Sequence, residues 1–140
     1  PYFYITLLEY MYSNPQALDK FTSKIRAWNC GGDILDQAFA QEWFKYMKKP
    51  LLDGYGLSEA GPNVAISGPS CFRLGTVGKA LEGTEVKISE DGELLIKNPS
   101  IATKYLGKNG TRIVDDAGWL HSGDKACVDK DGFIIVQGRK

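Results

Sequence analysis

The chain has 140 residues, which is long enough for one compact domain with a buried core. Its hydrophobic fraction of 43% and charged fraction of 24% are ordinary for a soluble globular protein. Seventeen acidic side chains balance seventeen lysines and arginines, so no net field draws nucleic acid or an anionic membrane to the chain. No apolar run has the length of a membrane span, and we therefore exclude a nucleic-acid partner and an integral membrane segment.

We expect a cytoplasmic protein, because the first residues lack the basic and then apolar layout of a signal peptide. Three cysteines, Cys30, Cys71 and Cys127, are odd in number and lack the paired spacing of a metal site. They are interpreted as buried or incidental thiols in a reducing compartment. A nucleophilic cysteine would need a base, and the chain has one histidine, His121.

The predicted elements begin with a helix over residues 2–12. The side chains of this segment are apolar nearly all round, which is typical of a buried helix. Asn14-Pro15 breaks the helix, and residues 16–24 are expected to form a short helical link to the next element.

The following segments predict a strand, a helix and a second strand. Residues 25–30 alternate as a strand does and end at Gly31-Gly32. Asp33 is placed to cap a helix over residues 34–47, which a proline then ends. Residues 51–55 are short and apolar, as in a buried strand. This order predicts one unit of a parallel sheet with a crossover helix.

In the second half of the chain, glycines and prolines separate short segments, which indicates β structure with turns. Residues 84–89 and 93–97 predict a hairpin around Asp91-Gly92. Residues 125–128 and 133–137 predict another pair of strands joined by a short turn.

Together these elements predict an α/β protein. The strand-helix-strand unit belongs to an α/β part over residues 1–71. Residues 72–140 are expected to form a β-rich subdomain, a small distorted barrel or sheet, with one helical turn at residues 100–106. No internal repeat or low-complexity tract interrupts either part.

Two short loops carry residue types that suit a nucleotide. In Tyr55-Gly56-Leu57-Ser58-Glu59, a carboxylate follows a hydroxyl on a glycine-hinged loop and can hold a metal ion and touch a phosphate. Residues 118–124 end in Asp124, which can accept hydrogen bonds from both ribose hydroxyls. Arg139 adds a fixed positive fork. Taken singly, a solvated surface glutamate or a weak surface ion pair explains each loop equally well.

In this order and spacing, the motifs resemble the AMP-forming acyl-CoA synthetases. That family belongs to a wider adenylate-forming superfamily, which includes peptide-synthetase adenylation domains and luciferases. The similarity covers residues 20–140, and it implies the end of a large N-terminal domain, before a hinge and a small mobile domain. The matching segments are CGGD at 30–33, YGLSE at 55–59, GTVGKALEGTEVKI at 75–88, GELLIKNP at 92–99, GWLHSGD at 118–124 and DGFIIVQGRK at 131–140.

The resemblance implies an adenine site between two loops. Gly31 and Gly32 would lie flat against one face of the base, where a side chain would intrude. Tyr55 would stack on the other face. Asp53 would accept a hydrogen bond from the exocyclic amine, although a turn-forming aspartate before Gly54 explains this residue equally well.

The resemblance also implies the phosphate and ribose contacts. Ser58 would donate to a phosphate oxygen and Glu59 would ligate Mg²⁺ bridging the phosphates of ATP, which makes these two the expected catalytic residues. Asp124 would bind the ribose, with Arg139 assisting at the ribose and the hinge. His121 is interpreted as a solvated side chain. The expected nucleotide contacts are Gly31, Gly32, Asp53, Gly54, Tyr55, Gly56, Ser58, Asp124 and Arg139.

By resemblance, the chain is a fragment of a ligase that activates a carboxylic acid with ATP as acyl-AMP and transfers the acyl group to CoA. The motifs favour a medium- or long-chain fatty acid, and residues 61–64 are expected to be a loop beside its pocket. ATP, Mg²⁺ and CoA are the expected cofactors. Two alternatives stay open: an adenylation domain that loads a phosphopantetheine thiol on a carrier protein, and a noncatalytic nucleotide-binding module. The isolated fragment is expected to be inactive. The assignment requires the loop of Glu59 and Asp124 to be drawn around one nucleotide-sized hollow, and it fails if Glu59 and Asp124 lie on opposite sides of the molecule with no cleft between them.

Overall fold

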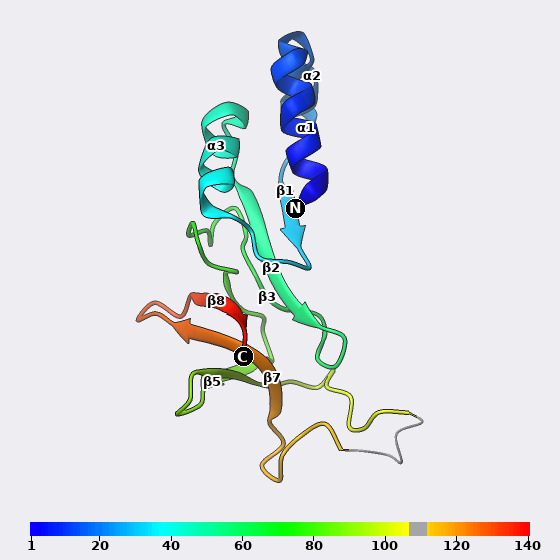
Figure 1. The fold of residues 1–140 in the computed structure, drawn as a ribbon, viewed down its shortest axis with the longest axis vertical. Coiled ribbons are helices and arrows are strands. Elements are labelled where there is room, and N and C mark those ends of the chain that lie inside the picture. Colours follow the sequence, from blue (N-terminus) through cyan, green and yellow to red (C-terminus); the bar gives the residue numbers. More distant parts are fainter. Residues whose placement is uncertain (107–111) are drawn as a thin grey trace.

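The computed structural model describes residues 1–106 and 112–140, with the helices gathered at one end of the molecule (Figure 1). The helical elements are α1 (Tyr2–Ser13), the 3₁₀ turn η1 (Pro15–Ala17), α2 (Leu18–Lys24) and α3 (Gln37–Met47). One sheet contains, in spatial order, β1 (Trp28–Gly31), β2 (Leu51–Leu57), β3 (Gly61–Ile66) and β4 (Lys79–Ala80). The other contains β5 (Glu85–Ile88), β6 (Glu93–Lys97), β7 (Leu120–Val128) and β8 (Ile134–Arg139). The predicted α/β class is therefore confirmed.

β1, α3 and β2 form the predicted strand-helix-strand unit. The two strands are parallel, with Trp28 opposite Leu51 and Gly31 opposite Gly54. Parallel neighbours need a crossover connection, and α3 provides it. β1 begins later than the predicted strand, because residues 25–27 form an irregular link between α2 and β1. β3 and β4 then extend the sheet with antiparallel pairs.

α3 begins at Gln37 rather than at residue 34, and its cap is Asp36 rather than Asp33. Asp36 Oδ1 accepts the Phe39 amide at 2.8 Å, which is the usual bond of a helix N-cap. Asp33 instead accepts the amide of the next residue, Ile34, within the loop. The predicted cap was wrong because two aspartates precede this helix, and only the second has a downstream amide of the first turn within reach.

The helices and the first sheet share an aromatic core. Trp43 is fully buried, and its ring centroid lies 5.1 Å from that of Tyr4 and 5.3 Å from that of Trp28. α1 contributes Met11 to this core, but Tyr2 is 79% exposed, so only one side of the helix is buried, which corrects the expectation of burial all round. None of the described helices has the length and apolar character that crossing a membrane requires.

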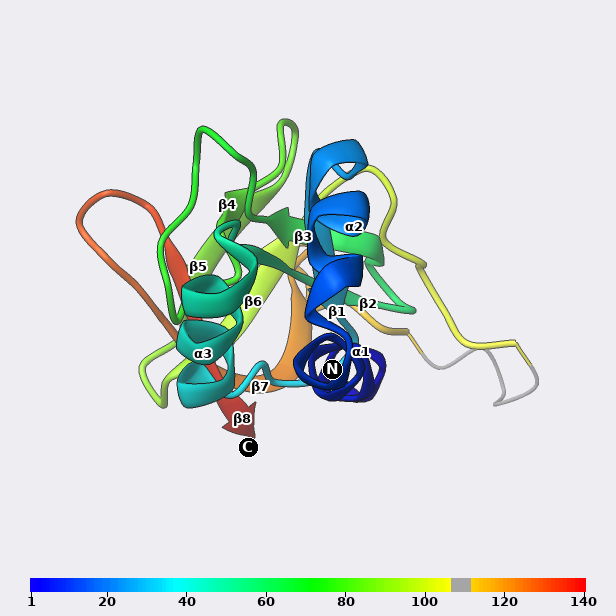
Figure 2. The same cartoon turned by 90° about the horizontal axis from the view of Figure 1, so that it is seen from above.

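The second sheet consists of two antiparallel hairpins that pair with each other. β5 and β6 form the hairpin predicted around Asp91-Gly92, with Val86 opposite Ile96. β7 and β8 form the other hairpin, and β7 is longer than predicted because it begins at Leu120. Apolar side chains from both sheets form a second core that includes Val64, Leu94 and Ile134. In the view from the helical end, the helices lie in front and this second sheet lies behind them (Figure 2).

Residues 100–106 are not helical, so the prediction of a helical turn was wrong. The Ala102 amide donates to the Glu59 carbonyl oxygen at 2.8 Å, and Lys104 lies in an isolated β-bridge. These groups bond to segments distant in the sequence rather than to a preceding helical turn. Residues 61–64 likewise belong to β3 and not to a loop, because their backbone pairs with β2.

Candidate functional site

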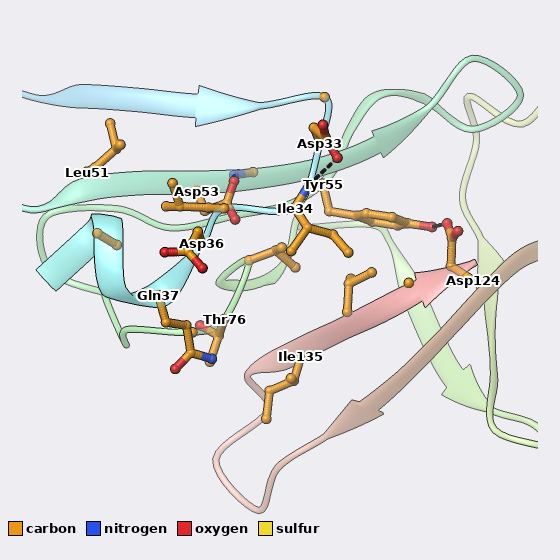
Figure 3. A pocket seen from close by; sticks show the side chains of 18 of the residues that line it. Asp33, Ile34, Asp36, Gln37, Leu51, Asp53, Tyr55, Thr76, Asp124 and Ile135 are labelled. Atoms are coloured by element: carbon orange, nitrogen blue, oxygen red, sulfur yellow. Dashed lines mark hydrogen bonds between the residues drawn. The ribbon is translucent and has the colours of Figure 1, made fainter. Parts of the chain in front are cut away.

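A cavity of about 540 Å³ lies between β2, the start of α3 and β8 (Figure 3). This volume is in the range of small-molecule sites. Its lining includes these predicted contact residues: Gly32, Asp53, Gly54, Tyr55, Gly56, Asp124 and Arg139. The predicted site residues outside the lining are Gly31, Ser58 and Glu59. Two further segments that were not predicted as contacts, residues 33–37 and residues 74–77 with Phe72, supply both apolar and polar side chains to the wall.

Tyr55 connects the two sheets across this cavity. Its hydroxyl donates to Asp124 Oδ2 at 2.5 Å, so a side chain of β2 contacts a side chain of β7 (Figure 3). Burial, and then the bond to Asp124, raise the pKa of Tyr55, which therefore remains a protonated donor. Since the ring also lines the cavity, its face is available to stack on a flat base.

Asp124 and Arg139 are register partners in the β7–β8 hairpin, as their positions around a hairpin predicted. Arg139 Nη1 donates to Asp124 Oδ1 at 2.9 Å and to the Ser122 carbonyl oxygen at 3.1 Å. Asp124 is only 5% exposed, and a buried carboxylate needs hydrogen-bond partners. Tyr55 and Arg139 supply one partner for each carboxylate oxygen. The acceptor oxygens are thereby held in one place, and their remaining lone pairs can accept from ligand hydroxyls.

Asp53 contributes a second carboxylate from β2. It accepts the amide of its neighbour Gly54 at 2.9 Å, which fits the interpretation of a local turn-type contact. Its place in the cavity lining fits the alternative interpretation of a ligand contact. Burial raises the pKa of Asp53 to about 6, although the bond from Gly54 acts in the opposite direction. The charge of this wall therefore changes between weakly acidic and neutral pH.

The predicted glycines have different structural roles. A Cβ on Gly56 would lie 2.1 Å from the Pro62 carbonyl oxygen, so the close approach of β3 to β2 requires this glycine. A Cβ on Gly31 would lie 3.1 Å from the Gly54 carbonyl oxygen on the neighbouring strand. Gly32 differs, because it has a φ of 84° and open space where a side chain would be. A ligand can thus approach the backbone at Gly32, whereas sheet packing accounts for Gly31 and Gly56.

Ser58 and Glu59 follow the end of β2, beyond the lining of the cavity. The Tyr105 hydroxyl donates to Glu59 Oε1 at 2.6 Å. This bond lowers the pKa of Glu59, and the charge of Arg139 acts in the same direction. Glu59 is therefore within electrostatic reach of the arginine that holds Asp124, although the two carboxylates do not share one cavity lining.

Within residues 1–106 and 112–140, no cluster of at least three acidic, histidine or cysteine side chains could hold a metal ion by itself. Mg²⁺ is commonly held by one or two carboxylates together with substrate phosphates. Glu59 fits the role of such a single protein ligand, because its lowered pKa keeps the carboxylate ionised.

Two residues that support the site, Glu93 and Tyr105, were not predicted from the sequence. Glu93 is 5% exposed and accepts hydrogen bonds from Lys140, which follows β8, and from Gly123 of β7. The sequence does contain one indication of Glu93, since it is a charged residue at the start of an otherwise apolar strand. Tyr105 lies in the segment that was predicted to be helical, so its contact could not be foreseen. His121 is half exposed, 3.5 Å from both Glu93 and Asp115, in accord with a solvated side chain.

Comparison with known proteins identifies the family. The family model described as AMP-binding enzyme matches residues 1–106. A long-chain-fatty-acid–CoA ligase of Salmonella typhimurium is 33% identical over 122 residues, which cover 79% of this chain and 22% of that protein. The anthranilate CoA ligase AuaEII, solved with anthranoyl-AMP, aligns at 26% identity with a TM-score of 0.73, covering 84% of this chain and 25% of that one. Apo MatB from Rhodopseudomonas palustris aligns at 23% identity with a TM-score of 0.85, covering 99% and 29%.

The chain therefore belongs to the family of AMP-binding enzymes, which confirms the resemblance seen in its motifs. MatB supports the fold alone, over nearly the whole chain. The chain spans about a fifth of the length of the Salmonella relative and a quarter of AuaEII.

Proposed function

We propose that this chain forms the adenosine end of the active site in a longer ATP-dependent acid–thiol ligase, called the parent enzyme below. One observation carries the proposal: Tyr55 of β2 bonds to Asp124 of β7, which also pairs with Arg139 of β8, in a chain of the AMP-binding family. This contact places an aromatic face, fixed acceptor oxygens and a cation at one cavity. A nucleotide requires an aromatic face for its base and fixed acceptors for its ribose hydroxyls, and the cation holds that acceptor and would assist at the ribose.

The order of residues along β2 supports a direction for the bound nucleotide. Adenine would lie between the backbone at Gly32 and the ring of Tyr55, with its amine near Asp53. The ribose hydroxyls would then donate to Asp124. The phosphates would extend toward Glu59, because the strand runs from the base end of the cavity to that residue.

The proposed reaction has two steps. A carboxylate oxygen of the substrate attacks the α-phosphorus of ATP, the bond to pyrophosphate breaks, and an acyl-adenylate forms. The sulfur of a thiol then attacks the acyl carbon, and AMP leaves. Ser58 would donate to a phosphate oxygen, and Glu59 would hold Mg²⁺. When bound, that ion supplies positive charge that weakens the repulsion between the phosphates and the attacking carboxylate. The chain's own contribution is positioning and charge complementarity.

We further propose a medium- or long-chain fatty acid and CoA as the substrates. The name of the Salmonella relative supports this choice. The proposed location is the cytoplasm, where ATP and CoA are available and where the three free cysteines would stay reduced. We also propose that the chain divides between residues 71 and 72 into an α/β part and a β-rich subdomain, and that the subdomain leads to a hinge.

Titration of the parent enzyme with a nonhydrolysable acyl-adenylate analogue tests the nucleotide site. Asp124→Ala should raise the Kd by about 30-fold, because hydrogen bonds to a charged group contribute about 1.5–3 kcal/mol. Asp116→Ala is the matched control, since it removes a fully exposed aspartate from the turn before β7 and should change the Kd by less than about twofold. Equal affinity of the wild type and the Asp124→Ala variant would exclude the proposed site.

Thiol-dependent release of pyrophosphate by the parent enzyme, screened over carboxylic acids, would identify the acid and the thiol. The isolated chain should show no turnover, because the proposed reaction needs groups beyond the adenosine end of the site. Formation of acyl-adenylate by the isolated chain would contradict this division of roles.

A further inference from the structure

β7 contains a bulge where it pairs with β6. The register passes from Glu93 opposite Lys125 to Leu95 opposite His121, so residues 122–124 lack regular ladder partners on that side. A bulge interrupts ladder hydrogen bonds and turns the bulged strand, and its backbone groups must then bond elsewhere. Asp124 is part of this bulge, so the shape of the bulge determines where the Asp124 carboxylate points.

The side chain of Glu93 supplies the bonds that the bulge needs. Its Oε1 accepts the Gly123 amide at 2.8 Å, and its Oε2 accepts from Lys140 Nζ at 3.0 Å. The Lys140 amide donates to the Gly123 carbonyl oxygen at 2.8 Å, so Gly123 is held through both of its backbone polar groups. The Asp124 amide donates to Ser122 Oγ at 3.0 Å. One carboxylate thus links the bulge to the residue that follows Arg139.

Glu93 is buried although it does not line the cavity. Glu93, Ser122 and Asp124 are 5%, 7% and 5% exposed, so they form a continuous buried polar group. A buried carboxylate costs free energy unless it is paired and hydrogen-bonded. Burial alone would raise the pKa of Glu93, but the Gly123 amide and Lys140 outweigh burial and lower it. The buried negative charge of Glu93 is therefore compensated by the Gly123 amide and the Lys140 ammonium group.

Gly123 is suited to this arrangement for two reasons. Its φ of 74° lies in the left-handed region that favours glycine. A Cβ at this position would also lie 3.3 Å from Arg139 Nη2, so the glycine lets the guanidinium pack over the bulge. The bond from Gly123 to Glu93 therefore fixes the peptide on which Arg139 rests.

We propose that Glu93 is a positioning residue for nucleotide recognition: it holds the Gly123 peptide and the end of β8, and thereby sets where Asp124 and Arg139 meet the ribose. This role rests on the proposed function, because the ribose contact belongs to it. A residue that served only the stability of the fold would change the amount of folded enzyme. A positioning residue changes the affinity of the folded enzyme for the nucleotide.

The experiment compares Glu93→Ala and Glu93→Gln in the parent enzyme, with separate KM values for ATP and for the acid. Glu93→Ala should raise the KM for ATP by about tenfold, since a buried amide loses its acceptor. Glu93→Gln keeps a carbonyl oxygen for the Gly123 amide but not the charge that pairs with Lys140, and should raise this KM by about threefold. The KM for the acid should change by less than about twofold in both variants.

Glu90→Gln is the matched control, because Glu90 is exposed in the same hairpin and should have no effect. A fall in kcat with the KM for ATP unchanged in Glu93→Gln would overturn the positioning role. If Glu93→Ala does not fold, the nearly isosteric Glu93→Gln variant still decides between these outcomes.

A double-mutant cycle separates this inference from the proposed function. The Kd of the acyl-adenylate analogue is measured for Glu93→Gln, Asp124→Ala and the double variant. If Glu93 acts through Asp124, adding Glu93→Gln to Asp124→Ala should weaken binding by less than about 1.5-fold. Fully additive effects would overturn the positioning role alone. No effect of Asp124→Ala would instead remove the proposed nucleotide site.

Discussion

β2 and β7 border the same cavity but contribute to it differently. β2 contributes backbone and a ring: Gly56 lets β3 approach closely, and Tyr55 reaches across the cavity. Its carboxylate at Asp53 has a raised pKa because it is buried. β7 contributes charge: its Asp124 is paired with Arg139, and its neighbouring residue Gly123 bonds to Glu93 of β6, whose pKa is lowered by this bond and by Lys140.

The difference shows two ways to build one wall of the proposed nucleotide site. A flat base would be accommodated by the open backbone at Gly32, after β1, and by the aromatic face of Tyr55, while Gly56 keeps β3 close to β2. Ribose hydroxyls need acceptors at fixed positions, and a buried acceptor stays fixed only when other groups hold it. The β2 side is therefore sensitive to a larger side chain at its glycine and to the pH through Asp53. The β7 side is sensitive to the loss of the groups that hydrogen-bond to Asp124.

The largest expected effect comes from adding volume to β2. Gly56→Ala should lower the free energy of unfolding of the parent enzyme by about 3 kcal/mol, because the new Cβ would collide with the Pro62 carbonyl oxygen. Urea denaturation, with the protease susceptibility of this region as the readout, measures the change in the free energy of unfolding. Gly68→Ala is the control, since open space surrounds that position. Equal stability of the two variants would contradict the claim that β2 is sensitive to added side-chain volume at Gly56.

The next effect concerns pH and Asp53. The ionised carboxylate accepts from an amine, so adenosine affinity should rise about tenfold between about pH 5 and pH 7, as expected for a carboxyl with a pKa of about 6. Adenosine is the probe because it carries no phosphate that titrates in this range. Isothermal titration at several pH values measures the slope, and Asp53→Asn should abolish it.

The same carboxyl links pH to stability. Its folded-state pKa of about 6 lies above the ordinary 3.8, so ionisation of Asp53 costs stability as the pH rises from about 4 to about 6. Asp53→Asn should therefore be stabilising relative to the wild type at pH 7, and less so at pH 4. An identical pH profile of the two proteins would show that Asp53 is not buried as described.

The smallest effect is expected at the phosphate end. Tyr105→Phe removes the hydroxyl that bonds to Glu59 and should raise the KM for MgATP by about threefold, since the contact is partly exposed. Equilibrium binding of adenosine should not change, because Glu59 lies outside the cavity lining. A matching loss of adenosine affinity would mean that the phosphate end and the base end are not separate.

Local patterns explain why part of the fold could be predicted. Apolar periodicity and glycine or proline breaks identify strands and helices within a few residues, which is how residues 51–55 and the hairpin at Asp91-Gly92 were found. The pairing of Asp124 with Arg139 also followed from a hairpin, which is a local structure. The cap of α3 and the segment 100–106 were mispredicted, because the deciding hydrogen bonds depend on neighbours that the pattern does not specify.

The sequence by itself determined the family and the α/β class, because the order of short motifs and the periodicity of apolar residues are properties of the linear chain. Only the tertiary structure decided that Tyr55 holds Asp124, that Gly56 serves sheet packing and that Glu93 is buried beneath a bulge. The Tyr55–Asp124 and Glu93–Gly123 bonds join residues far apart in the sequence, and the close approach of Gly56 to Pro62 depends on how β3 folds back on β2. Such contacts exist only in the folded molecule, because they depend on how the strands pair and pack.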